Sequence, residues 1–572
     1  MIQQGGITIF KHIIKLIFCI LFLLLSLYFT LTTFKPIYTS EEIIISYGIY
    51  PFDICKKNPE LWSIIKKTYL IFLSYSSLIL SNLIFKKITK ILSFISLNKK
   101  KSEHQLNTSS LCLKIGQNYK DKNIIYIPES GLYQNFLITG TIGSGKTSSA
   151  MYPFTKQLLE YNSHNSEKIA MLILDVKGNY YKQVLKYAND FNLEKDIIVI
   201  SLDSSICYNP LHKPNLKPQI LANRLKTILL LFSENNSESF WLDKAEEILT
   251  EFIKFCRIYN NGYVTFTELH RLVSEPNYYK EKIKIARNLF ITNKLSQAQI
   301  YELNSCLNFI QNDFENLDSR TKSILISEIS RITHTFISDY DVQKIFCSPQ
   351  KKLSFNGFSD ILKYGKIVVL NLNISEYTSL SKIISAYLKL DFQSEIMSNL
   401  SKNQVYKSAF ICDEYDKYAT KLDGDFFSLS REAKCINIIS TQSYSSLKNT
   451  LKDDSAVKVI TQNLINKIWF RTDDIYTIEE AQKQIGKIEK EKISRSISEN
   501  AKETHFSFIT KTLNSENSNI SESYNISSQN EYIYDTNFFT QNLETFTALA
   551  FLSDGNKIYS PQKIKMFPYF NL

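Results

Sequence analysis

Glycine is scarce in this sequence, which makes one cluster of glycines informative. The chain has only 15 glycines among its 572 residues, yet Gly140, Gly143 and Gly145 fall within six positions. Such clustering is rare by chance at this composition, so we interpret it as a specific motif and not as an ordinary glycine-rich turn.

Cysteine and histidine do not occur at the spacings of common metal sites. The nine cysteines stand at positions 19, 55, 112, 207, 256, 306, 347, 412 and 435 without any C-x-x-C pair, and the seven histidines are scattered without an H-E-x-x-H motif. This pattern argues against a structural zinc site or a disulfide framework, and it favours a reducing compartment for most of the chain.

The composition has no strong excess of either charge. The net charge of +11 is compatible with a nucleic acid or an anionic membrane surface as partner, but lysine usage along the whole chain also accounts for it. With 572 residues and 44% apolar content, the chain is long enough for more than one domain with a sizeable core.

Charged residues are missing from two stretches near the N-terminus. Residues 16–34 form a run of nineteen without a charge, and residues 69–85 form a weaker run that contains four serines and Asn82. Their lengths predict two transmembrane helices, which together define a membrane anchor over residues 1–101. A signal peptide is the less favoured alternative, because no small-residue cleavage site follows the first run.

The glycine cluster belongs to Gly140-Thr-Ile-Gly-Ser-Gly-Lys-Thr147, which matches the P-loop pattern G-x-x-x-x-G-K-[ST]. An apolar run precedes it and a helical pattern begins at Ser148, which is the strand, loop and helix order of a phosphate site. We expect Lys146 to reach the β- and γ-phosphates of ATP and the Thr147 hydroxyl to bind magnesium. The predicted nucleotide-binding residues are Gly140, Thr141, Ile142, Gly143, Ser144, Gly145, Lys146, Thr147 and Ser148.

The P-loop also predicts how the chain is oriented in a bacterial inner membrane. Lysines flank both predicted spans, so the positive-inside pattern gives only a modest preference. Because ATP and reduced thiols are cytoplasmic, we expect residues 86–572 inside the cell and a short external loop at about residues 36–67.

Short apolar, β-branched or aromatic runs alternate with helical patterns, which predicts an α/β fold with a parallel sheet and helices on both faces. Residues 214–345 lack such runs and predict an all-α inserted domain between two parts of a nucleotide-binding domain, 102–213 and 346–572. Pro153 should end or kink the first helix, and residues 489–530 predict a polar, loosely packed excursion. The predicted strands cover residues 123–127, 136–139, 170–174, 197–202, 367–372, 409–412, 436–440, 468–471 and 548–552.

Two carboxylates and two further polar residues complete the predicted active site. Asp413 and Glu414 end an apolar strand, so we expect Asp413 to hold magnesium and Glu414 to orient and deprotonate the attacking water. Gln442 follows the next strand and could sense the γ-phosphate. Arg431 lies between these strands and could act as an arginine finger on a neighbouring subunit's nucleotide, although an exposed arginine at a helix end remains the alternative.

Further motifs follow in order along the chain: Leu174-Asp175-Val-Lys177-Gly178, Asn209-Pro210-Leu211, Phe240-Trp241, Ser440-Thr-Gln442-Ser443, Phe470-Arg471-Thr472 and Gly486. Together with the two N-terminal runs, the P-loop followed by Pro153, Asp413-Glu414 and Arg431, they resemble the type IV secretion coupling proteins, the TraG/TraD-like conjugative ATPases. The resemblance implies a RecA-like P-loop ATPase domain with an all-α insert and a homohexameric ring at the inner membrane. It also implies delivery of relaxase-bound single-stranded DNA or effector proteins to the secretion channel.

Three functions are compatible with these motifs. A membrane-anchored ATPase that energises transfer is favoured, because a pure scaffold need not keep a water-activating carboxylate such as Glu414. The alternatives are a nucleotide-binding substrate receptor with little hydrolysis and an FtsK-like DNA translocase. Whether the cargo is DNA or protein stays open at this level.

Overall fold

The computed structural model describes residues 111–571 except for 176, 233–238, 373–375, 501–504, 507–512 and 515–518, together with isolated positions between 24 and 72. The two predicted membrane helices lie outside the described residues apart from these isolated positions. No helix among the residues described is long and apolar enough to cross a membrane.

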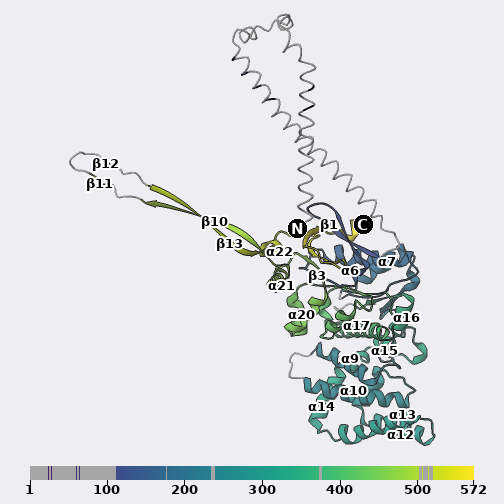
Figure 1. Cartoon of the computed structure of the whole chain (residues 1–572). Coiled ribbons are helices and arrows are strands. Elements are labelled where there is room, and N and C mark those ends of the chain that lie inside the picture. The colour runs from purple at the N-terminus through teal and green to yellow at the C-terminus, as the bar shows by residue number, and fades with distance from the viewer. Residues whose placement is uncertain are drawn as a thin grey trace. The chain divides into compact units, whose positions relative to one another are not determined.

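The centre of the described fold is an eleven-stranded sheet with the order β2-β1-β15-β14-β9-β3-β8-β7-β4-β6-β5 (Figure 1). All nine predicted strands are confirmed and end within two residues of the predicted limits. The strands are β1 (Cys112–Asn118), β2 (Ile124–Pro128), β3 (Phe136–Thr139), β4 (Ala170–Leu174), β5 (Ile197–Ser201), β6 (Ile367–Asn371), β7 (Ser408–Cys412), β8 (Cys435–Thr441), β9 (Asn466–Phe470), β14 (Thr547–Phe551) and β15 (Gln562–Lys565).

The prediction of a purely parallel sheet was wrong, because the sheet is mixed. The seven strands from β9 to β5 in this order all run parallel to one another. At the other side, β14, β15, β1 and β2 pair antiparallel. The parallel strands read as continuous apolar runs because both of their faces are buried, whereas β1 and β15, which were not predicted, contain several partly exposed residues, which weakens their sequence signal.

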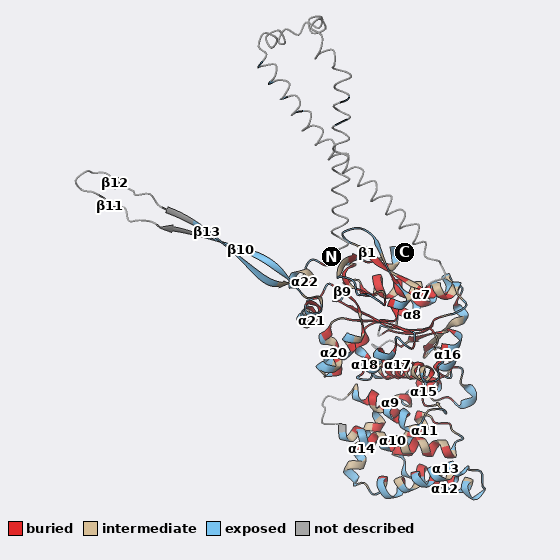
Figure 2. Cartoon of the chain, viewed as in Figure 1, coloured by how far each residue is buried: buried red, intermediate tan, exposed pale blue. Residues whose placement is uncertain are grey.

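Helices cover both faces of the sheet, so side chains of one strand alternate between two cores (Figure 2). Met171 and Ile173 of β4 pack with α7 (Tyr152–His164) and α8 (Tyr180–Asp190). Leu172 and Leu174 point to the opposite core, which contains α16 (Phe358–Tyr364), α17 (Thr378–Ser401) and α18 (Asp423–Leu429).

The helix after the P-loop does not end at Pro153, which was one of the two predicted outcomes. A π-helical turn, η1 (Thr147–Met151), leads directly into α7, in which Pro153 occupies the first turn. Proline is tolerated there because its missing N–H would have no partner in a regular first turn, and the wider π-turn before it needs no bond from residue 153.

Between β5 and β6, every described element is a helix. The helices α9 (Pro218–Leu230), α10 (Ser239–Tyr259), α11 (Phe266–Ser274), α12 (Pro276–Ile291), α13 (Gln297–Asn308), α14 (Ser319–Thr333) and α15 (Tyr340–Phe346) form what we call the helical block. Its apolar side chains share one core with α17 and one face of the sheet. α17 contacts both α9 and β4, and in Figure 1 it lies between the sheet and the block.

The predicted loose excursion at about residues 489–530 contains regular structure. β10 (Lys487–Asn500) and β13 (Asn519–Tyr532) pair antiparallel along their full length and form a ribbon that projects beyond α21 (Ile475–Ile485) and α22 (Thr536–Thr540) (Figure 1). Its polar composition reflects a two-stranded ribbon in which the described side chains are exposed except at Glu531 and Tyr532, which are half-buried. It does not reflect an absence of strands.

Candidate functional site

The predicted site residues come from loops that follow parallel strands. The P-loop follows β3, the pair Asp413 and Glu414 follows β7, and Gln442 follows β8. Lys177, for which no site role was predicted, follows β4. Because these strands are parallel and close together in the sheet order, their carboxyl ends meet at one edge. This edge is where ligands bind in open α/β sheets.

The P-loop has the backbone geometry of an anion-binding nest. Gly143 and Gly145 have φ angles of 78° and 101°, which residues with a Cβ rarely adopt. A Cβ on Gly145 would also lie 2.5 Å from the ring of Phe546. The loop is held to β9 by Thr141, whose backbone N–H donates to the carbonyl oxygen of Arg471 over 2.8 Å. Ile142 is exposed, and the Ser148 hydroxyl donates to the Gly145 carbonyl.

Lys146 is a buried cation without a salt-bridge partner in the described part of the chain. Its Nζ donates to the loop's own carbonyl oxygens, at 2.5 Å from Gly140 and 3.2 Å from Thr141. Burial lowers the pKa of Lys146, and the charges of Asp413 and Glu414 oppose that shift. A buried ammonium beside a nest of N–H groups fits a phosphate group, which would supply the missing negative charge.

Thr147 and Asp413 lie together as a magnesium site requires. The Thr147 hydroxyl donates to Oδ2 of Asp413 over 2.7 Å, and the Ser440 hydroxyl donates to Oδ1. Burial raises the pKa of Asp413, and the two hydroxyl donors oppose the shift. No group of three or more His, Cys, Asp and Glu side chains in the described ranges could hold a metal alone. One carboxylate and one hydroxyl therefore fit a Mg²⁺ that arrives with nucleotide phosphates.

Glu414 is in contact with Gln442, the other residue predicted to act near the γ-phosphate. The Gln442 amide donates to Oε2 of Glu414 over 3.0 Å. Lys177 lies on the other side, with its Nζ 3.5 Å from Oε1. Glu414 itself is left-handed, with φ 53° and ψ 44°, although it is not a glycine. Such a conformation is strained and is commonly found at functional sites.

Arg431 is not brought to this edge in its own chain. It is exposed in the turn before β8, whereas Gln442 follows the end of β8. At the usual strand rise, the seven residues of β8 separate the two ends by about 20 Å. Within the described residues, the Arg431 side chain has no hydrogen-bond or ion-pair partner.

Three contributors to the site were missed from the sequence. Lys177 contacts Glu414, Ser440 orients Asp413, and the backbone N–H of Phe546 donates to the carbonyl oxygen of the P-loop residue Ser144 over 3.2 Å. Lys177 stands three residues after the apolar strand β4, in the loop at the same edge of the sheet as Asp413, and that loop position could have suggested its place. Phe546 carries no such signal, since only the folded chain brings it to the loop.

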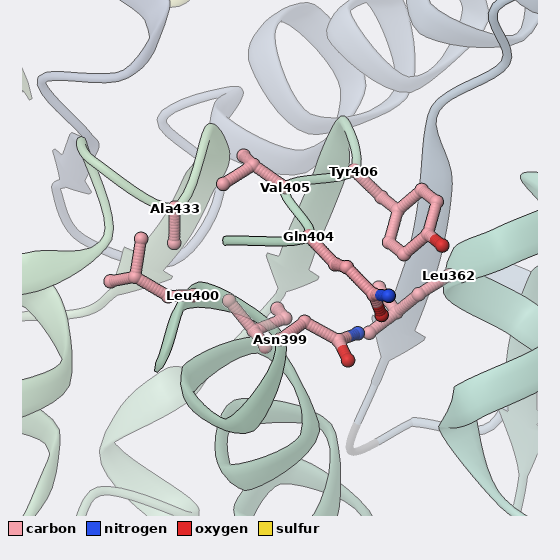
Figure 3. A pocket seen from close by; sticks show the side chains of 8 residues that line it. Leu362, Asn399, Leu400, Gln404, Val405, Tyr406 and Ala433 are labelled. Carbon is pink, nitrogen blue, oxygen red and sulfur yellow. The ribbon is translucent and has the colours of Figure 1, made fainter. Parts of the chain in front are cut away.

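A separate small pocket lies at the opposite edge of the sheet. Figure 3 shows its side chains, among them Leu400 in the last turn of α17, Tyr406 before β7 and Ala433 before β8. These positions precede the strands whose carboxyl ends carry the P-loop edge, so this pocket is not part of the site described above.

The fold and the site together define a P-loop protein with a large mixed sheet. The solved structures that resemble the chain include the conjugative coupling protein TrwBdeltaN70 in its unbound monoclinic form, with TM-score 0.53 and 12% identity over 80% of this chain and 89% of that chain. TrwB with a non-hydrolysable ATP analogue and TrwB with ADP and Mg²⁺ both give TM-score 0.51 and 12% identity over 80% of this chain, covering 89% and 90% of those chains. At this identity the likeness establishes the fold.

Residues 123–313 match the family model of the type IV secretion-system coupling protein DNA-binding domain. No curated protein matches the chain. Over residues 123–313 the chain is similar to the type IV secretion coupling proteins.

Proposed function

We propose that the chain is a coupling ATPase of the bacterial inner membrane that recruits substrate and uses ATP hydrolysis to deliver it to a type IV secretion channel. One observation supports this proposal most directly. Thr147 and Asp413 have side chains that can bind magnesium, and they lie at the same edge of the sheet as Glu414, which is in contact with Gln442. A site for nucleotide binding alone would not need a buried carboxylate positioned by an amide.

The side chains divide the work of hydrolysis between them. The P-loop N–H groups and Lys146 hold the phosphates, while Thr147 and Asp413 hold magnesium, which neutralises charge on the transferred group when bound. Glu414 accepts a proton from the attacking water and Gln442 fixes the direction of that carboxylate. Lys177 can stabilise negative charge beside Glu414. Turnover of ATP by the full-length chain in detergent tests this proposal, and its absence would favour the receptor alternative.

The match of residues 123–313 to a DNA-binding domain family supports DNA as one cargo. We propose that residues 214–345 form an inserted all-α domain that takes part in recognising relaxase-bound DNA or effector proteins. The FtsK-like translocase is the weaker alternative, because the chain carries this helical insert and only two predicted membrane spans.

We propose that Arg431 acts in trans within a homohexamer. Its position at the edge opposite Gln442 means that it can serve only another subunit's nucleotide. Mixing Arg431→Ala chains with Lys146→Ala chains should restore part of the hydrolysis that each lacks, because some interfaces then combine an intact P-loop with an intact arginine. Absence of rescue at every ratio, in rings shown to be mixed, would contradict a role in trans.

Membrane placement can be tested through Cys55, the one cysteine in the predicted external loop of residues 36–67. A membrane-impermeant thiol reagent should label Cys55 in intact cells and leave Cys112 unlabelled, because Cys112 is predicted to lie in the cytoplasm. A Cys55→Ser chain is the matched control and should lose the label. Labelling of Cys112 without Cys55 would mean that the orientation is inverted.

A further inference from the structure

Helix α17 carries two charged residues in the interior of the protein. Lys389 and Asp391 are each at most 1% exposed. Buried charges are unfavourable unless they are paired and fully hydrogen-bonded. The partners of these two residues therefore show which parts of the chain α17 connects.

Lys389 belongs to a buried cluster of hydrogen-bonded polar groups next to the segment that follows Glu414. Its Nζ lies 2.5 Å from Oδ2 of Asp423 and donates to the backbone carbonyl of Tyr418 over 2.6 Å. Asp423 also accepts from the Tyr415 hydroxyl and from the amide of Gln393. Lys389, Asp423 and Tyr415 are all fully buried, so none of these contacts can be replaced by water.

The cluster fixes the chain that directly follows the strained Glu414. Tyr415 is the next residue, and its hydroxyl is tied to Asp423. The N–H of Thr420, five residues further on, donates to the same carboxylate over 2.8 Å. A left-handed residue other than glycine persists only where its surroundings over-determine it. These anchors provide that constraint on one side of Glu414, and the end of β7 provides it on the other.

Asp391 is bonded on the opposite face of the same helix. Residues two apart in an α-helix point about 200° apart, so Asp391 faces away from Lys389. It lies 2.6 Å from Nζ of Lys213 and 2.8 Å from the guanidinium of Arg224 on α9, and it accepts from the Tyr208 hydroxyl. Burial alone would raise the pKa of Asp391, but the two cations outweigh it and the pKa is lowered. α17 is thus bonded to the helical block on one face and to the segment after Glu414 on the other.

We propose that Asp423, Lys389 and Tyr415 are positioning residues for Glu414, and that α17 makes their placement depend on how the helical block is seated. The inference rests on the proposed hydrolytic function. A displacement of the block, for example on binding cargo, would be transmitted through the Asp391 contacts to the residue that activates water.

Tyr415→Phe tests the positioning cluster, because it removes one hydroxyl and keeps the buried ring. We expect kcat for ATP to fall roughly tenfold, since catalytic groups tolerate little displacement, with KM and the affinity for a non-hydrolysable ATP analogue unchanged. The matched control is Tyr133→Phe, which removes a hydroxyl that donates to Glu129 from a buried tyrosine outside the helical block, and it should keep the wild-type kcat. An unchanged kcat in Tyr415→Phe, with the wild type active, would overturn the positioning role. An inactive wild type would instead overturn the proposed function.

Tyr208→Phe tests the link through α17, since it removes one bond to Asp391 and leaves both cations in place. We expect Tyr208→Phe to lower kcat less than Tyr415→Phe does. In the double variant, the fold-loss of kcat should differ from the product of the two single fold-losses. Residues that act independently give additive free-energy changes. A double variant that shows the simple product would remove α17 from the proposal.

Discussion

Replacing Lys146 with alanine lowers ATP turnover at least about 100-fold, the usual loss when a preorganised charge-stabilising group is removed. The loss is expected because Lys146 is the cation of the nest and has no ion pair of its own in the described chain. Steady-state hydrolysis by the purified full-length chain measures it. Lys156→Ala, further along α7, is the matched control and should retain turnover.

The same variant makes a prediction about stability. Burial lowers the pKa of Lys146, so the fold disfavours the charged lysine in the absence of a bound anion. The unfolding midpoint without nucleotide should therefore stay close to that of the wild type. Saturating nucleotide should stabilise the wild type, by about 2.7 kcal/mol at 100 times Kd, and leave the variant unaffected. A variant that still hydrolyses ATP would contradict the role of Lys146.

Glu414→Gln should bind ATP and hydrolyse it at least about 100-fold more slowly, since general-base catalysis contributes about that much or more. The amide keeps the shape and can still accept from Gln442, but it cannot take a proton from water. Loss of the Lys177 contact matters little because Lys177 is half exposed. Nucleotide binding and turnover are measured on the same preparation, and sedimentation with ATP should reveal accumulated rings.

Glu479→Gln provides the control for this change, because Glu479 is an exposed glutamate on α21 away from the P-loop edge. If Glu414→Gln failed to bind nucleotide, Glu414 would have a structural role. A turnover close to that of the wild type would assign the water-activating role to another group.

The local sequence pattern was sufficient to predict the positions of the parallel strands and of the P-loop. β3 and β4 occur at the predicted residues because a strand buried on both faces is a continuous apolar run with polar residues at its end. The placement of Glu414 and Gln442 at one edge followed from sequence, since residues after adjacent parallel strands meet there, but their contact was not predicted. These inferences need only the local sequence and the fact that the carboxyl ends of adjacent parallel strands lie at one edge of the sheet.

Contacts between distant segments were not predictable in this way. Arg431 and Gln442 are close in sequence, but a complete strand lies between them. Ser440 and Phe546 act through neighbours that only the sheet order defines. The ribbon of β10 and β13 was missed because its polar strands lack the apolar runs that mark strands with buried faces.

The sheet order also determines when the nucleotide loop can be completed during synthesis. β3 pairs with β8 and β9, so that Phe136 lies opposite Ile438 on one side and Asn466 on the other. The last support of the loop, Phe546, is itself held by the N–H of Met566, six residues from the end of the chain. A nascent chain on the ribosome therefore exposes its P-loop motif long before these partners exist. The loop cannot reach its native form until β14 and β15, which adjoin Phe546 and Met566 in the sequence, have been synthesised and have left the exit tunnel.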